Sequence, residues 1–181
     1  DCLAGYYSSE GQSSCNACES GKFASLPKSS TCVACEVGKY SSAHSSACTL
    51  CSSGKYVDVT GASQCVDCYS GKISAASGAS TCSVCAAGYY SAAGASSCLD
   101  CVAGKASGSG SSSCTSCLPG TSSGLNAATC SNCITGKYAS AAGSVSCTNC
   151  PVGKYQGIVG QASCVACSPG SYASVAGESG K

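Results

Sequence analysis

The sequence predicts a small disulfide-rich fold: an elongated linear array of about ten or eleven modules of 16–17 residues, with short β-strands and turns and essentially no α-helix. Cysteine supplies 21 of the 181 residues, above the roughly 8–10% typical of disulfide scaffolds. Leu, Ile, Val and Phe together supply only 22 residues, about 12% of the chain, below the ~20% under which chains rarely fold unaided. The third observation is a cysteine motif that recurs along the whole sequence.

The repeat is defined by ten C-x-x-C pairs whose first cysteines follow one another at steps of 16 or 17 residues. Cys2 stands 16 residues before Cys18, so it is read as the second cysteine of a truncated pair. Residues 1–181 are therefore expected to form a single tandem-repeat array in which each module contacts mainly its neighbours. The modules begin near Cys2, Cys18, Cys35, Cys51, Cys68, Cys85, Cys101, Cys117, Cys133, Cys150 and Cys167.

The second cysteine is followed by a glycine in every module, and in most modules by a lysine and an aromatic residue after that glycine. Glycine follows the second cysteine by three residues in all eleven modules, which indicates a positive φ or a close backbone approach. An aromatic residue two positions later is expected to start a short strand, to pack on the disulfide and to form the core of the module. These structural aromatics are Tyr7, Phe23, Tyr40, Tyr56, Tyr90, Tyr138, Tyr155 and Tyr172. Tyr6, Tyr69 and Tyr89 lie outside this column and are expected to be exposed, and His44 is interpreted as an ordinary loop residue.

Two pairing schemes are open to the cysteines: each C-x-x-C closes on itself, or the later cysteine of one pair bonds the earlier cysteine of the next. Chain entropy favours the longer loop of the second scheme by roughly 1 kcal/mol per bridge. We therefore predict the bridges Cys2–Cys15, Cys18–Cys32, Cys35–Cys48, Cys51–Cys65, Cys68–Cys82, Cys85–Cys98, Cys101–Cys114, Cys117–Cys130, Cys133–Cys147 and Cys150–Cys164. Cys167 is left unpaired or bonded to another chain.

Composition also limits the class of function. So many cysteines predict a secreted, extracellular protein, and the sequence is expected to be a processed form or an excised piece, since no signal peptide is visible. A net charge of +1, with no arginine, argues against a nucleic-acid surface, and no apolar run is long enough for a membrane span. No catalytic constellation or cofactor motif is present, so we expect neither an enzyme nor a cofactor. Serine-rich loops are candidate sites of O-glycosylation.

A lysine follows the glycine in seven modules and should form a stripe along the array. One interpretation is a solvated edge that discourages strand pairing, and the other is a ladder that contacts acidic glycans. Zinc binding is the rival use of the cysteines, because successive C-x-x-C pairs approximate a zinc ribbon. The uniform spacing favours disulfides over zinc, since discrete metal sites usually alternate short and variable gaps.

The stretches Cys35-Glu36-Val37-Gly38-Lys39-Tyr40 and Cys150-Pro151-Val152-Gly153-Lys154-Tyr155, each closed by a later C-x-x-C, resemble the ephrin-receptor-like cysteine-rich repeat. They are also similar to the first submodule of tumour-necrosis-factor-receptor cysteine-rich domains. The resemblance covers the whole chain and implies elongated stacks of small disulfide-stapled loops. Loops rich in Ala, Ser and Gly also resemble surface proteins of algae and other protists, including components of flagellar hairs.

These observations predict an extracellular structural protein, a disulfide-stapled rod or filament subunit of a cell surface, wall or appendage such as a flagellar hair. Its expected partners are further copies of itself or other extracellular structural proteins, with acidic glycans as a further candidate. The alternatives are the ectodomain of a receptor or adhesin that binds a protein or glycan, and a cysteine-rich zinc-binding protein.

Overall fold

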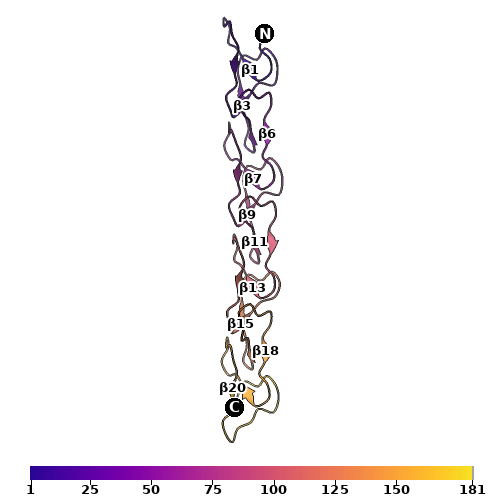
Figure 1. The fold of residues 1–181 in the computed structure, drawn as a ribbon, viewed down its shortest axis with the longest axis vertical. Helices are drawn as coiled ribbons and strands as arrows, with labels where there is room; N and C mark the ends of the chain where they lie inside the picture. The colour runs from indigo at the N-terminus through magenta and orange to yellow at the C-terminus, as the bar shows by residue number, and fades with distance from the viewer. Residues whose placement is uncertain (181) are drawn as a thin grey trace. The chain divides into compact units, whose positions relative to one another are not determined.

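The structure, a computed structural model, describes residues 1–180 and contains no helix among them. All regular structure is in two-residue strands that pair as ten separate antiparallel hairpins. The predicted fold class, small and disulfide-rich with short strands and turns, is confirmed. Figure 1 shows the succession of loops along the chain.

Each hairpin pairs the residues that follow the module's glycine with the two residues enclosed by the next C-x-x-C. In the fourth module, for example, Tyr56 lies opposite Val66 and Lys55 opposite Asp67. The hairpins are β1(Tyr6–Tyr7) with β2(Asn16–Ala17), β3(Lys22–Phe23) with β4(Val33–Ala34), β5(Lys39–Tyr40) with β6(Thr49–Leu50), β7(Lys55–Tyr56) with β8(Val66–Asp67), β9(Lys72–Ile73) with β10(Ser83–Val84), β11(Tyr89–Tyr90) with β12(Leu99–Asp100), β13(Lys105–Ala106) with β14(Thr115–Ser116), β15(Thr121–Ser122) with β16(Ser131–Asn132), β17(Lys137–Tyr138) with β18(Thr148–Asn149), and β19(Lys154–Tyr155) with β20(Val165–Ala166).

The aromatic position thus ends the first strand of each hairpin instead of starting it, and the second strand lies inside the C-x-x-C motif. A two-residue hairpin has too few hydrogen bonds to persist alone in water. The disulfide beside each hairpin and the contacts with other modules must therefore hold it.

The chain divides into two compact units. The first comprises residues 1–84 and 91–98, and the second comprises residues 85–90 and the chain from Leu99 on. Within each unit the loops stack into a narrow column (Figure 1).

Candidate functional site: the module seam and its flanking columns

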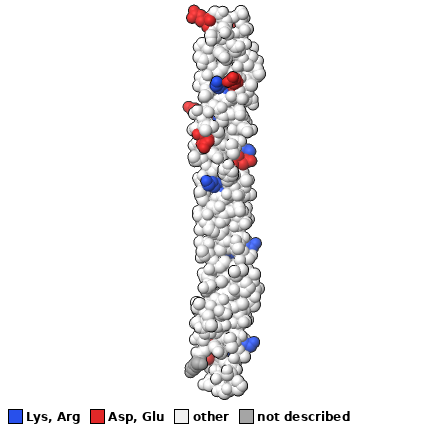
Figure 2. Space-filling model, turned by 90° about the vertical axis from the view of Figure 1, so that its left-hand side faces the viewer, with Lys and Arg blue, Asp and Glu red and all other residues white. Residues whose placement is uncertain are grey.

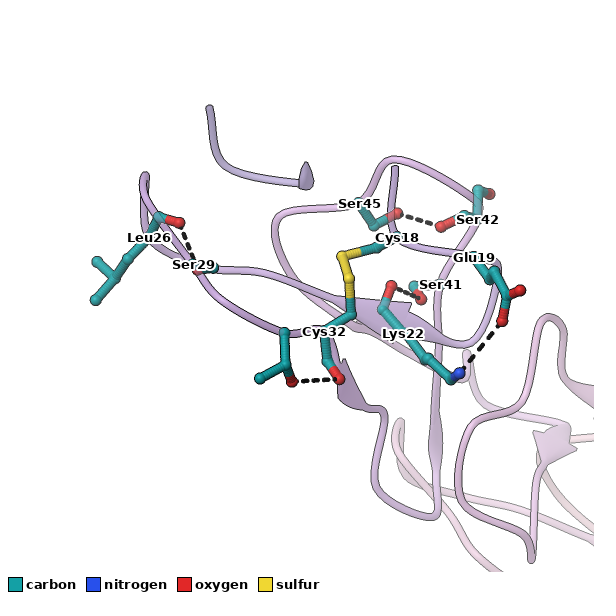
Figure 3. Close-up of a disulfide and its surroundings, with 10 residues drawn as sticks. Cys18, Glu19, Lys22, Leu26, Ser29, Cys32, Ser41, Ser42 and Ser45 are labelled. Carbon is teal, nitrogen blue, oxygen red and sulfur yellow. Dashed lines mark hydrogen bonds and ion pairs between the residues drawn. A yellow bond between two sulfur atoms is a disulfide. The ribbon is translucent and has the colours of Figure 1, made fainter. Parts of the chain in front are cut away.

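Each disulfide joins a buried cysteine to one that is more accessible to solvent. Except for Cys167, the second cysteine of each pair is almost completely enclosed, as for Cys18 and Cys35, whose exposed fractions are 0%. Figure 3 shows the Cys18–Cys32 bridge, which joins Cα atoms 5.7 Å apart, with Lys22 and Glu19 on the same loop. The bridges join Cys2 to Cys15, Cys18 to Cys32, Cys35 to Cys48, Cys51 to Cys65, Cys68 to Cys82, Cys101 to Cys114, Cys117 to Cys130, Cys133 to Cys147, and Cys150 to Cys164.

Three further cysteines complete the set. Cys85 and Cys98 are also disulfide-bonded. Cys167 is a free, half-buried thiol. Residues 1–180 hold no group of three or more His, Cys, Asp or Glu side chains placed to bind a metal ion.

A seam of backbone hydrogen bonds joins successive modules. We call the glycine three residues after the second cysteine the module glycine, and the third residue after that glycine the seam residue. The amide of Gly38 in the third module donates to the carbonyl of the seam residue Val57 in the fourth at 2.8 Å. The Val57 amide in turn donates to the carbonyl of Ala79 in the fifth module at 3.2 Å. A third bond runs in the opposite direction, from the Gly61 amide to the Cys35 carbonyl at 2.7 Å.

The seam residues from the second module on are buried: Ala24, Ser41, Val57, Ser74, Ser91, Ser107, Ser123, Ala139, Gln156 and Ala173. Small residues dominate because the two backbones approach closely along the seam. Several seam serines also satisfy their hydroxyl groups there, as when Ser91 donates to the Lys72 carbonyl at 3.2 Å. A buried hydroxyl without such a partner would be costly.

The module glycine allows the backbone of its module to contact the backbone of the second module further along the chain. The φ angle of Gly54 is +81°, in the left-handed region that favours glycine. A Cβ atom on Gly54 would also overlap the carbonyl of Gly94, two modules further along the chain. Gly5, Gly21, Gly38, Gly88, Gly104, Gly120 and Gly136 are placed in the same way. The expectation that each module contacts mainly its neighbours was therefore incomplete.

The aromatic column is half-buried instead of forming an enclosed core. Tyr7, Phe23, Tyr40, Tyr56, Tyr90, Tyr138 and Tyr155 are of this kind. Tyr172 is the exception, with 80% of its surface exposed. The enclosed positions belong to the second cysteines of the pairs and to the seam residues.

Of the three tyrosines expected to be exposed, only Tyr69 is, at 67%. Tyr6 and Tyr89 are half-buried because each contacts a turn two modules ahead. Tyr6 lies 5.4 Å from the His44 ring, between ring centroids, so His44 is more than an ordinary loop residue. The Asn126 side-chain amide donates to the Tyr89 hydroxyl at 3.2 Å.

These two contacts share one pattern. Tyr6 and Tyr89 stand at the lysine position of their modules, and His44 and Asn126 stand where most modules have a second glycine. His44 and Asn126 both adopt positive φ angles, +64° and +55°. A larger side chain in one module is thus matched by a non-glycine turn residue two modules later.

The lysine column is only partly neutralised. Lys22 pairs with Glu19 at 3.2 Å, Lys39 with Glu36 at 2.9 Å, and Lys55 with Asp67 at 2.5 Å. The hydrogen bond from Lys39, together with its positive charge, lowers the pKa of Glu36. Lys72, Lys105, Lys137 and Lys154 have no carboxylate partner among the residues described.

Two features of the site escaped the sequence analysis. The seam residues carry no distinctive residue type, although their constant offset from the glycine marks them in retrospect. In the sequence, the second-neighbour contacts are indicated only by residues that depart from the repeat in pairs. Tyr6 and Tyr89 stand at the lysine position, and His44 and Asn126 stand at the position of the second glycine two modules later.

Within residues 1–180 there is no helix with the length and apolarity needed to cross a membrane.

Comparison with known families matches residues 120–160 to the family described as tyrosine-protein kinase ephrin type A/B receptor-like. No curated protein matches the chain. The matched segment contains the whole Cys133–Cys147 bridge and Cys130 of the Cys117–Cys130 bridge. Its hairpins and seam repeat those of the other modules. The chain is therefore a disulfide-rich protein built from tandem cysteine-rich repeats, and its residues 120–160 are similar to the ephrin-receptor-like repeat.

Proposed function

We propose that the chain is an extracellular structural protein, a disulfide-stapled rod or filament subunit of a cell surface, wall or appendage such as a flagellar hair. The observation that carries the proposal is the regular seam. Each step repeats the glycine-to-seam hydrogen bond, at 2.7–3.1 Å, beside a covalent bridge. A repeat in which every module uses the same contacts can be lengthened by adding modules without a new interface.

The surface supports self-association as the mode of assembly. Figure 2 shows a face on which charged residues are few and most of the surface is uncharged. On the C-x-x-C strands, Val33, Leu50, Val66, Val84, Leu99 and Val165 are between 46% and 60% exposed. A net charge of +1 opposes association only weakly. Copies of the chain, or similar structural proteins, are therefore the proposed partners.

A receptor or adhesin ectodomain is the second candidate, because the matched family takes its description from receptors. It differs from the first in what the chain does on its own. A filament subunit associates with copies of itself, whereas an ectodomain stays monomeric and binds a different protein or glycan.

Electron microscopy and sedimentation of the oxidised protein distinguish the two. We expect concentration-dependent association into elongated assemblies, which dissolve when the exposed aliphatic residues Val33, Leu50 and Val66 are replaced by threonine. Threonine is the matched choice for Val33 and Val66, because Thr49, Thr115 and Thr148 occupy the same position of the C-x-x-C strand in other modules. A protein that stays monomeric over the whole concentration range would contradict the filament proposal.

A further inference from the structure

A lateral groove recurs at one position of the module. It lies between two successive modules. The earlier module contributes the residue at its aromatic position. The later module contributes the residue after its second cysteine and the residue at its lysine position. Tyr56, Tyr69 and Lys72 line one such groove, with a volume of about 210 Å³. The corresponding residues Ala106, Leu118 and Thr121 line a second of about 360 Å³. Tyr155, Ser168 and Ser171 line a third of about 320 Å³.

Only the Tyr56–Tyr69–Lys72 groove combines aromatic rings with a cation among these three. Tyr69 presents an exposed ring on one side, and the half-buried Tyr56 lies on the other. A hydrogen bond of 3.0 Å from the Lys72 amide to the Tyr69 carbonyl holds the two residues at opposite ends of one tight turn. Thr81 adds a hydroxyl group to the lining.

The cation in this groove is not neutralised. In the second and third modules, Glu19 and Glu36 occupy the position of Tyr69 and form ion pairs with Lys22 and Lys39. In the fifth module tyrosine replaces the glutamate, so the ammonium group of Lys72 has no carboxylate partner within the described chain. One substitution thus both adds a ring and leaves a positive charge available.

We infer that the groove formed by Tyr56, Tyr69, Lys72 and Thr81 binds a carboxylated sugar, a uronic acid residue of an acidic glycan. The apolar face of a pyranose ring stacks on the exposed Tyr69 ring, the sugar carboxylate pairs with the Lys72 ammonium, and Thr81 hydrogen-bonds a sugar hydroxyl. The volume is below the roughly 300–1,000 Å³ of pockets that enclose drug-sized ligands, and so suits one sugar ring of a longer polymer. This inference is independent of the filament proposal, because a monomer would present the same groove.

The test is calorimetric titration of the intact, oxidised chain with an oligosaccharide of galacturonic acid, and with a neutral galactose oligosaccharide as the control ligand. We expect binding of the acidic oligosaccharide that weakens with added salt, and much weaker binding of the neutral one. Tyr69→Ser should weaken binding about tenfold, and Lys72→Thr about fivefold. Both replacements occur naturally at the equivalent positions Ser52 and Thr121, so the fold accepts them.

Lys22→Thr is the matched control, since Lys22 is already paired with Glu19. It should leave the affinity unchanged. Glu36→Tyr should recreate the groove with Phe23 and Lys39 and raise the binding stoichiometry. The inference is overturned if the acidic oligosaccharide does not bind, if the neutral one binds equally well, if Lys22→Thr weakens binding as much as Lys72→Thr, or if Glu36→Tyr leaves the stoichiometry unchanged.

Discussion

At the scale of single residues, the module glycine serves two purposes that can be separated. Gly54 and Gly153 occupy the same position of their modules and have nearly the same φ, +81° and +79°. A Cβ on Gly54 would overlap Gly94, whereas a Cβ on Gly153 would meet nothing within 4 Å. A substitution at Gly153 therefore tests the backbone conformation alone, whereas a substitution at Gly54 tests the conformation together with the close approach to Gly94.

We expect Gly153→Ala to destabilise the chain by about 1–2 kcal/mol, the cost of placing alanine in the left-handed region. Gly54→Ala should cost clearly more, because the Gly94 backbone must also move. Thermal unfolding of the oxidised variants followed by circular dichroism measures both. Gly124→Ala, where φ is not positive and nothing lies within 4 Å, should be nearly neutral. Equal losses of stability for Gly54→Ala and Gly153→Ala would mean that the close approach of Gly54 to Gly94 does not contribute to the free energy of unfolding.

The ion pair between Glu36 and Lys39 makes a prediction about pH. The pKa of Glu36 in the folded protein lies below its ordinary value of 4.5, so the pair stabilises the fold above that pH and ceases to do so as pH falls through the lowered pKa. Lys39→Gln should return the Glu36 pKa toward 4.5, measured by carbon NMR of the carboxyl group. Lys137→Gln, at the same position of another module, should leave it unchanged. A Glu36 pKa that is the same with and without Lys39 would contradict this account.

At the scale of the module, the Tyr89–Asn126 contact joins loops that are not neighbours along the chain. We expect a coupling free energy of about 0.5–1.5 kcal/mol in a double-mutant cycle of Tyr89→Phe and Asn126→Gly, as for a typical hydrogen bond. Tyr89→Phe should destabilise the original chain and have little further effect once Asn126 is glycine. Tyr90→Phe provides the control, since no hydrogen bond of its hydroxyl is found in the described part of the chain. Additive effects of the two substitutions would show that the contact is not energetically coupled.

The hairpins show which parts of the fold could be predicted from sequence. Regular spacing of the C-x-x-C pairs and of the glycine was enough to predict the module type, because covalent closure and positive φ impose strict residue requirements. The location of β8(Val66–Asp67) inside a C-x-x-C could not be predicted, since a two-residue strand has no periodicity to detect. Burial of seam residues such as Ser41 and Ser91 also escaped prediction, because only the packing of one module on the next removes them from water.

The charge distribution marks a similar limit at the candidate site. Sequence spacing alone could pair Glu19 with Lys22 and Glu36 with Lys39. The pairing of Lys55 with Asp67 across a hairpin required the register of β7(Lys55–Tyr56) and β8. The groove at Tyr69 likewise required the structure, because its two rings come from different modules.

At the scale of the whole chain, the bridges limit how far the protein can be stretched. A module unfolded with its disulfide intact contributes the span of the bridge, 5.7 Å between Cα atoms for Cys51–Cys65, and three residue steps to the next bridge. The limit is roughly 16 Å per module. After reduction, 16 or 17 residues per module can extend to roughly 55–60 Å.

Single-molecule stretching of the chain should therefore show more than a threefold increase in contour length per module when a reductant is added. The oxidised chain serves as its own control before reduction. An oxidised contour length close to the reduced one would show that the bridges do not enclose the loops as described.

The second-neighbour contacts also restrict how the number of modules can change when the gene that encodes this repeat array gains or loses repeats. Insertion or loss of one module between Tyr89 and Asn126 would preserve every seam, since all seams use the same bonds, yet it would separate these two residues by the wrong number of steps. Tyr6 and His44 constrain the opposite half of the chain in the same manner. Recombination between near-identical repeats would thus be tolerated most readily outside these two intervals, which would retain a constant length among otherwise variable descendants.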